Sequence, residues 1–222
     1  MAVDLYRVEC ALLGNLPFDD LTSEERRVFQ REKAAFEVGR MANRFAQGYY
    51  AHATAVTVAR VPSAKDSLTG MQPNQPISTE TMARKNGTMH VFDRHYYLDY
   101  FNGPEISHEV ATVWLVGSLL ALGDALSKNE YFDRRPELEM VYHLRNGIAH
   151  GNRFHFLMSG LKRLIKHPAH NRTASAHVPN AEFEITPDLA GKQVLFDFMG
   201  PGDVLDLLQS IGYRLMYLRR RL

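Results

Sequence analysis

The chain of 222 residues has a single cysteine, Cys10, which rules out an internal disulfide and a cysteine-based metal site. So little cysteine indicates a reducing compartment. The chain also lacks a net excess of either charge, since it has 26 Lys and Arg against 25 Asp and Glu. The global charge therefore gives no sign of a polyanionic partner. With 45% apolar and 23% charged residues, the composition is that of a globular protein with a sizeable core.

Targeting and cofactor signals are missing as well. The first residues lack a basic stretch followed by an apolar run, so they do not indicate a secretory signal. The most apolar run, 110–122, is too short to span a bilayer and is soon followed by Asp124. We therefore expect a soluble cytoplasmic protein that does not bind a membrane. No glycine-rich phosphate loop, Gly-x-Ser-x-Gly elbow or zincin motif is present, and we expect no cofactor and no metal.

Four long segments are predicted to be helical. Thr22 and Ser23 precede acidic residues at the start of the first segment, and prolines stand near the start of the other three. Small residues share one face of the first helix, where another helix of the same chain, or less readily a second copy, would approach closely. In the last helix, an apolar stripe is predicted to be buried. The four helical segments are 23–60, 104–129, 136–167 and 201 onward. The small residues of the first helix are Ala35, Gly39, Ala42, Ala46 and Ala53. The apolar stripe of the last helix is Val204, Leu208, Ile211 and Leu215.

Two regions do not fit a helix. Residues 62–104 hold several prolines and an Asn86-Gly87 turn signal, so we expect a long irregular insertion with a possible short hairpin at that turn. Alternating apolar and polar residues on both sides of a turn cluster predict a β-hairpin over 181–199. The sequence thus predicts one mainly α domain over 1–222, a four-helix bundle with a 62–104 insertion and a small hairpin before the last helix.

Acidic residues are absent from 140–181, although this stretch holds six Arg and Lys and six of the ten histidines. Segregated positive charge of this kind suits a phosphate ligand. A solvated basic surface whose acidic partners lie elsewhere in the chain explains it equally well. The basic residues are Arg145, Arg153, Lys162, Arg163, Lys166 and Arg172, and the histidines are His143, His150, His155, His167, His170 and His177.

A polar row follows the helix predicted to begin near Pro136. Tyr142, Asn146, His150 and Arg153 lie on one stripe, with Arg145 at its margin, because residues three and four apart share a face. Arg145 and His150 themselves differ by about 140° and about 7.5 Å of rise on a regular helix. The opposite side is apolar and is predicted to face the core through Leu138, Val141, Leu144 and Ile148.

The run Arg145-Asn146-Gly147-Ile148-Ala149-His150, within a four-helix chain, resembles the hallmark of the HEPN family (higher eukaryotes and prokaryotes nucleotide-binding). That hallmark is an arginine, four to six residues and a histidine, often with a polar residue directly after the arginine. The resemblance implies a four-helix bundle and a metal-independent endoribonuclease in which two copies form one cleft. It makes Arg145, Asn146 and His150 the catalytic residues. We expect Tyr142, Arg153, Lys162 and Arg163 to contact RNA.

The implied chemistry is attack of the RNA 2′-hydroxyl on its own phosphate, which yields a 2′,3′-cyclic phosphate and a 5′-hydroxyl. Histidine transfers protons near neutral pH, and arginine binds phosphate oxygens. One histidine does not easily serve both ends of an in-line displacement, so a homodimer with a composite cleft would help. The resemblance also suggests a role in defence or in a toxin–antitoxin pair, where a protein regulator is possible.

Several alternatives stay open. In the first, the domain lacks activity and is an RNA-binding, nucleotide-binding or dimerisation module. In the second, a purely structural interpretation, Arg145 caps carbonyl groups and His150 is buried. Asp124 either faces Arg145 or, as we favour, lies at the solvated end of its helix. If a dimer forms, we expect apolar surface such as the small-residue face of the first helix to hold it. Base stacking by Tyr96, Tyr97 and Tyr100 and phosphate contacts by 219–221 are weaker possibilities.

Overall fold

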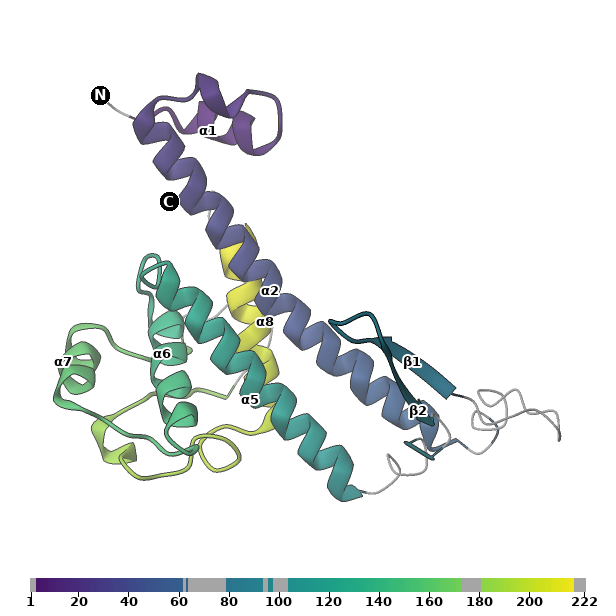
Figure 1. The fold of residues 1–222 in the computed structure, drawn as a ribbon. Helices are drawn as coiled ribbons and strands as arrows, with labels where there is room; N and C mark the ends of the chain where they lie inside the picture. Colours follow the sequence, from purple (N-terminus) through teal and green to yellow (C-terminus); the bar gives the residue numbers. More distant parts are fainter. Residues whose placement is uncertain are drawn as a thin grey trace. The chain divides into compact units, whose positions relative to one another are not determined.

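A computed structural model describes residues 3–61, 63, 79–93, 96–97, 104–172 and 181–217 (Figure 1). In this part of the chain the fold is mainly helical, as predicted, with a small two-stranded sheet. The elements are, in order, α1 (Leu5–Leu12), α2 (Ser23–Ala59), β1 (Thr79–Ala83), β2 (Met89–Asp93), α5 (Pro104–Lys128), α6 (Pro136–Ala149), α7 (Met158–Lys166) and α8 (Pro201–Tyr217). Short 3₁₀ helices span Phe18–Asp20 and Pro187–Leu189.

The structure divides into two compact units. One unit is formed from residues 1–46 and 115–222 and the other from residues 47–114. All residues of the polar row and of the apolar stripe on α8 belong to the first unit. The prediction of one domain over 1–222 stays a prediction.

The core of the first unit is built from α5, α6 and α8. Leucines spaced by three and four along α5 are fully buried, and the predicted apolar side of α6 is buried as well. The stripe on α8 is buried as predicted. Each fully buried side chain of this kind stabilises the fold by about 1.5–3 kcal/mol. The α5 leucines are Leu115, Leu119, Leu122 and Leu126.

Gly39, on the small-residue face of α2, packs against α8 of the same chain (Figure 1). A Cβ atom on Gly39 would lie 2.8 Å from Cβ of Leu215 and 3.0 Å from the carbonyl oxygen of Gly212. Ala35, Ala42, Ala46 and Gly39 are buried. The expectation of a close helix neighbour within the chain is therefore confirmed. This part of the face is buried within the single chain, and the suggestion that the small-residue face holds a dimer stays a prediction.

The predicted third helix is wrong in one respect, because it is two helices. α6 ends at Ala149, and α7 begins only at Met158. The break follows from Gly151 and Asn152, whose φ angles are +82° and +61°. A right-handed helix cannot pass through two residues in the left-handed region, which glycine and asparagine tolerate best.

The two hairpin predictions have different outcomes. β1 and β2 pair antiparallel, with Ala83 opposite Met89, around the predicted Asn86-Gly87 turn. Residues 181–199 do not form a hairpin. Instead, Glu184 forms an isolated bridge with His170, and Gln193 forms one with Arg153. The two strands expected to pair with each other instead bridge to the segments that follow α6 and α7, and Pro187 begins a 3₁₀ turn.

Parts of the predicted insertion, including Tyr100, lie outside the described residues, as do residues 218–222 with their three arginines. Within the described part, one helix, α5 over Glu105–Lys128, is long and apolar enough to cross a membrane by those criteria alone. A core helix of a soluble protein meets the same criteria, and four leucines of α5 are fully buried. The cytoplasmic location stays a prediction.

We predict that Gly39→Ala lowers the free energy of unfolding by about 1–3 kcal/mol, because the added methyl group overpacks the α2–α8 contact. Gly117→Ala is the control, since Gly117 lies in α5 with no atom within 4 Å of the added Cβ. This control should gain about 0.5–1 kcal/mol from helix propensity. Urea denaturation of both variants measures the difference. Equal stability of the two would contradict the assigned packing.

Candidate functional site

α6 separates a core side from an accessible side. Leu138, Val141, Leu144 and Ile148 are buried, as predicted, while Arg145 and Asn146 are partly exposed and His150 is exposed. The backbone N–H of His150 donates to carbonyl oxygens of the last helical turn, so the residue caps α6. Its imidazole is therefore held at the end of a rigid helix but stays open to solvent.

Arg145 is bound to α5. Its Nε and Nη2 donate to Asp124 Oδ1 at 3.0 and 2.8 Å, and its Nη1 donates to Asn146 Oδ1 at 3.4 Å. Gly123 makes this contact possible, because a Cβ atom there would lie 2.5 Å from Cγ of Arg145. The Asp124 side chain is 63% exposed. Both interpretations of Asp124 are thus partly correct, since it is solvated and also faces Arg145.

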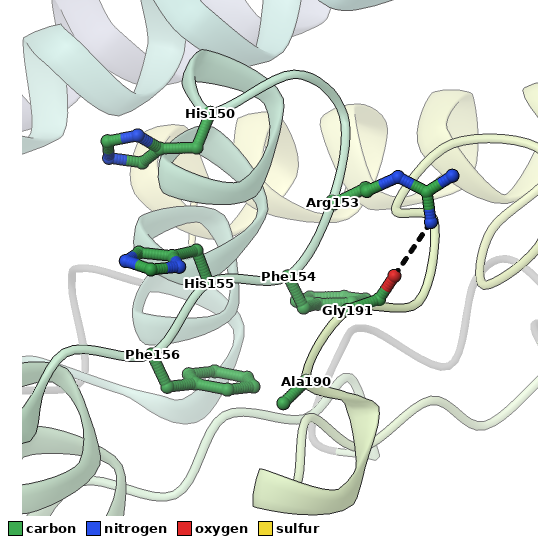
Figure 2. Close-up of a pocket in the computed structure, with 7 residues that line it drawn as sticks. All are labelled: His150, Arg153, Phe154, His155, Phe156, Ala190 and Gly191. Carbon is green, nitrogen blue, oxygen red and sulfur yellow. Dashed lines mark hydrogen bonds between the residues drawn. The ribbon is translucent and has the colours of Figure 1, made fainter.

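His150 lines a pocket of about 480 Å³ together with residues of the segment after the helix break (Figure 2). The imidazole of His155 lies beside it, with ring centres 5.4 Å apart. Figure 2 shows both rings on the same side of the segment, followed by Phe156. Phe154, which precedes His155, is buried and anchors the segment to the core.

Arg153 lines the same pocket but extends away from the two imidazoles in Figure 2. Its Nη1 donates to the carbonyl oxygen of Gly191 at 2.8 Å. The residue as a whole is exposed. Arg153 therefore keeps a charge that no carboxylate neutralises among the described residues.

Arg163 has a different environment. Its Nε and Nη2 donate to both carboxylate oxygens of the fully buried Glu139, at 2.6 and 3.0 Å, and its side chain is 19% exposed. The guanidinium lies over the rings of Tyr142 and Tyr131, 3.8 and 4.5 Å from their centres. These contacts hold α7 on α6. Lys162, one residue earlier, is exposed.

The candidate residues are therefore brought together in three groups. The first joins Arg145, Asn146 and Asp124, and the second joins Tyr142 with Arg163. His150 and Arg153 line the pocket with His155. Arg145 is not among the pocket residues.

Sequence reasoning did not select His155, Glu139 or Asp124 as site residues. A signal for His155 was present, because the Gly151-Asn152 pair typically ends a helix and turns the chain. Nothing in the local sequence pointed to Glu139, since its partner Arg163 is 24 residues away. Among the described residues, no group of three or more His, Cys, Asp or Glu is arranged to hold a metal ion.

The acid-free stretch is partly neutralised by acids from outside it. Arg145 pairs with Asp124, Arg163 with Glu139, and Arg172 with Glu182 and Glu184. The interpretation in which the acidic partners lie elsewhere in the chain therefore describes these three arginines. The positive charge that faces solvent comes mainly from Arg153, Lys162 and Lys166.

His143 lies one turn before Gly147 and is only 3% exposed. Burial, and secondarily the nearby Arg163 guanidinium, lower the pKa of His143 from 6.5 to about 4. Its Nε2 is buried without a hydrogen-bond partner. A neutral imidazole is tolerated there, whereas a protonated one is not.

We predict a stability loss in mild acid that depends on His143. Its folded pKa lies below its unfolded value, so the unfolded state binds the extra proton between pH 6.5 and about 4. Between pH 7 and pH 5 the wild type should lose about 2 kcal/mol more than His143→Gln. Urea denaturation at pH 5, 6 and 7 measures both proteins. Parallel pH profiles would show that the imidazole is already accessible to protons in the fold.

A comparison of the chain with protein-family models, with curated proteins and with solved structures finds no match. The resemblance to the HEPN family therefore depends on the Arg145–His150 motif and the helical fold.

Proposed function

We propose that the chain is a HEPN-like, metal-independent endoribonuclease that uses Arg145, Asn146 and His150. One observation carries this proposal: α6 buries its apolar side and presents the arginine and histidine of the motif on its accessible side. The structural interpretation required a buried His150 and an Arg145 that caps carbonyl groups. His150 is instead exposed, and Arg145 donates to Asp124 and Asn146.

The chemistry fits these residue types. An exposed imidazole removes a proton from the 2′-hydroxyl or donates one to the leaving 5′-oxygen. The Arg145 guanidinium, oriented by Asp124, offers paired N–H donors to the charge that develops on the phosphate. The expected products are a 2′,3′-cyclic phosphate and a 5′-hydroxyl.

A homodimer would complete the site. Arg145 is held on α5, while His150 lines the pocket beyond the end of α6. If a second copy related by a two-fold axis faces this surface, the Arg145 of one chain and the His150 of the other share one phosphate. Asp124 reduces the repulsion between two such surfaces, because it neutralises Arg145 until a phosphate binds.

A non-catalytic RNA-binding module is the second candidate. The observation that favours it is the pairing of Arg145 and Arg163 with carboxylates, which leaves lysines and Arg153 as the free cations of this region. Such a module would bind RNA in a salt-dependent way without cleaving it.

We predict that the purified protein cleaves single-stranded RNA in excess chelator and that the products end in 2′,3′-cyclic phosphates. His150→Ala should slow cleavage by about 10²–10⁴-fold, which is the usual contribution of a general acid or base. The matched control is His90→Ala, which removes an exposed histidine from the β1–β2 hairpin.

Two outcomes decide between the candidates. Salt-dependent binding without cleavage by the wild type supports the binding module and contradicts the enzyme. Equal cleavage by the wild type and His150→Ala contradicts the assigned site, because a contaminating nuclease or other residues would then act.

We also predict complementation between two inactive variants. In a heterodimer of Arg145→Ala and His150→Ala chains, one of the two clefts contains an intact Arg145 and an intact His150 from different chains. Its activity should be about half that of the wild type, while each variant homodimer is inactive. Differently tagged chains allow the heterodimer to be purified and assayed. An inactive heterodimer, or a wild-type monomer that cleaves at full rate, rules out the composite cleft.

A further inference from the structure

The pocket at the end of α6 holds a second exposed imidazole, that of His155. The ring centres of His150 and His155 are 5.4 Å apart, and the two planes are inclined by 48°. Within the described part of the chain, no hydrogen bond or ion pair occupies either ring, and both side chains are exposed. Exposed histidines without polar partners are free to exchange protons with a ligand.

The segment that places His155 is firmly built. Asn152 Oδ1 accepts from the N–H of Leu195 at 2.9 Å, and its amide donates to the carbonyl of the same residue at 3.3 Å. The N–H of Arg153 donates to the carbonyl of Gly147 at 3.0 Å. Phe154, directly before His155, exchanges backbone hydrogen bonds with residues 191 and 192. The position of His155 is therefore set by a network of bonds on both sides of the turn.

The spacing of the two rings suits one phosphate. In an in-line displacement the attacking and leaving oxygens stand on opposite sides of phosphorus, and each needs its own proton-transfer group. The ring centres lie 5.4 Å apart, so one phosphodiester that binds across the edges of both rings can place a different oxygen next to each imidazole. Proton transfer then needs a distance of about 2.6–3.2 Å between each ring nitrogen and its oxygen. The pocket of about 480 Å³ has room for a nucleotide.

We propose that His155 is a catalytic residue and that His150 and His155 of the same chain form the acid–base pair for RNA cleavage. One neutral imidazole takes the 2′-hydroxyl proton as the 2′-oxygen bonds to phosphorus. The bond from phosphorus to the 5′-oxygen breaks, and the other ring, protonated beforehand, donates its proton to that oxygen. Exchange with water then restores both rings, so that no oxidant, metal or further reactant is needed.

This inference rests on the proposed function and changes the part that a second copy plays in it. A single histidine per chain was the reason to require a second imidazole from the partner. With His155 in place, the second copy is needed only to supply Arg145, which does not line the pocket of its own chain.

The first test uses His155→Gln, His150→Gln and the control His90→Gln on the same RNA. We expect each of the first two to lose about 10²–10⁴-fold in rate and the control to keep the wild-type rate. Far-ultraviolet circular dichroism and salt-dependent RNA binding should match the wild type for all three, because the altered rings are exposed. Wild-type cleavage with an unchanged rate in His155→Gln overturns this inference alone.

The second measurement separates a proton donor from a residue that only shapes the pocket. At the bond that the wild type cleaves, the 5′-oxygen is replaced by sulfur, which departs as a thiolate without needing a proton. The variant that lacks the acid should recover most of the wild-type rate on this RNA, and the variant that lacks the base should not. Recovery by neither variant, or by both, contradicts an acid–base pair.

The third measurement asks whether the pair lies in one chain. In a heterodimer of His150→Gln and His155→Gln chains, no chain has both imidazoles, so we expect no cleavage. Activity near half that of the wild type would place the two rings in different chains and overturn the proposal. A wild type that cleaves no RNA would instead remove the proposed function itself.

Discussion

The first unit is organised around two carboxylates that have no contact with water. Glu137 and Glu139 of α6 are both fully buried, and a buried charge is tolerated only when it is paired and hydrogen-bonded. Glu137 pairs with Arg214 of α8, and Glu139 with Arg163 of α7. Replacing one partner of such a pair typically costs about 3–5 kcal/mol. Each pair therefore ties one further helix to α6, α8 through Arg214 and α7 through Arg163.

This constraint also decides where positive charge is available. Arg163 lies between two tyrosine rings and a buried carboxylate, so its guanidinium is used to assemble helices. Arg145 is held more loosely, because the Asp124 carboxylate that binds it is largely exposed and solvent weakens their attraction. A phosphate competes for Arg145 more easily than for Arg163. Two arginines in one basic stretch thus differ in what they can offer to a ligand, and the cause is the burial of their acidic partners.

The sequence predicted the helices well where local signals agree with packing. Proline at the start of α5, α6 and α8, the Thr22 and Ser23 cap signal at the start of α2, and the stripe on α8 identified elements that the structure contains. It predicted the core side of α6 as well. Partners that are distant in the sequence could not be predicted in the same way. The alternation over 181–199 predicted a hairpin, but Glu184 bridges to His170 and Gln193 bridges to Arg153 instead. The α1 helix was missed, although Asp4 caps it. At the site, the sequence suggested Arg145, Asn146 and His150, but not the contacts that orient them.

Among the predictions that were wrong, the unbroken third helix matters most for the site, because the chain in fact leaves the helix after Ala149. On an unbroken helix, residues 150 and 155 would diverge by about 140° and stand about 7.5 Å apart along the axis, so their rings would not share a pocket. Gly151 and Asn152, in the left-handed region, turn the chain so that His155 returns beside His150. The periodicity of α6 cannot reveal this arrangement, since it exists only because the periodicity stops. The geometry of the imidazole pair is thus a property of two turn residues and of the backbone bonds that secure them.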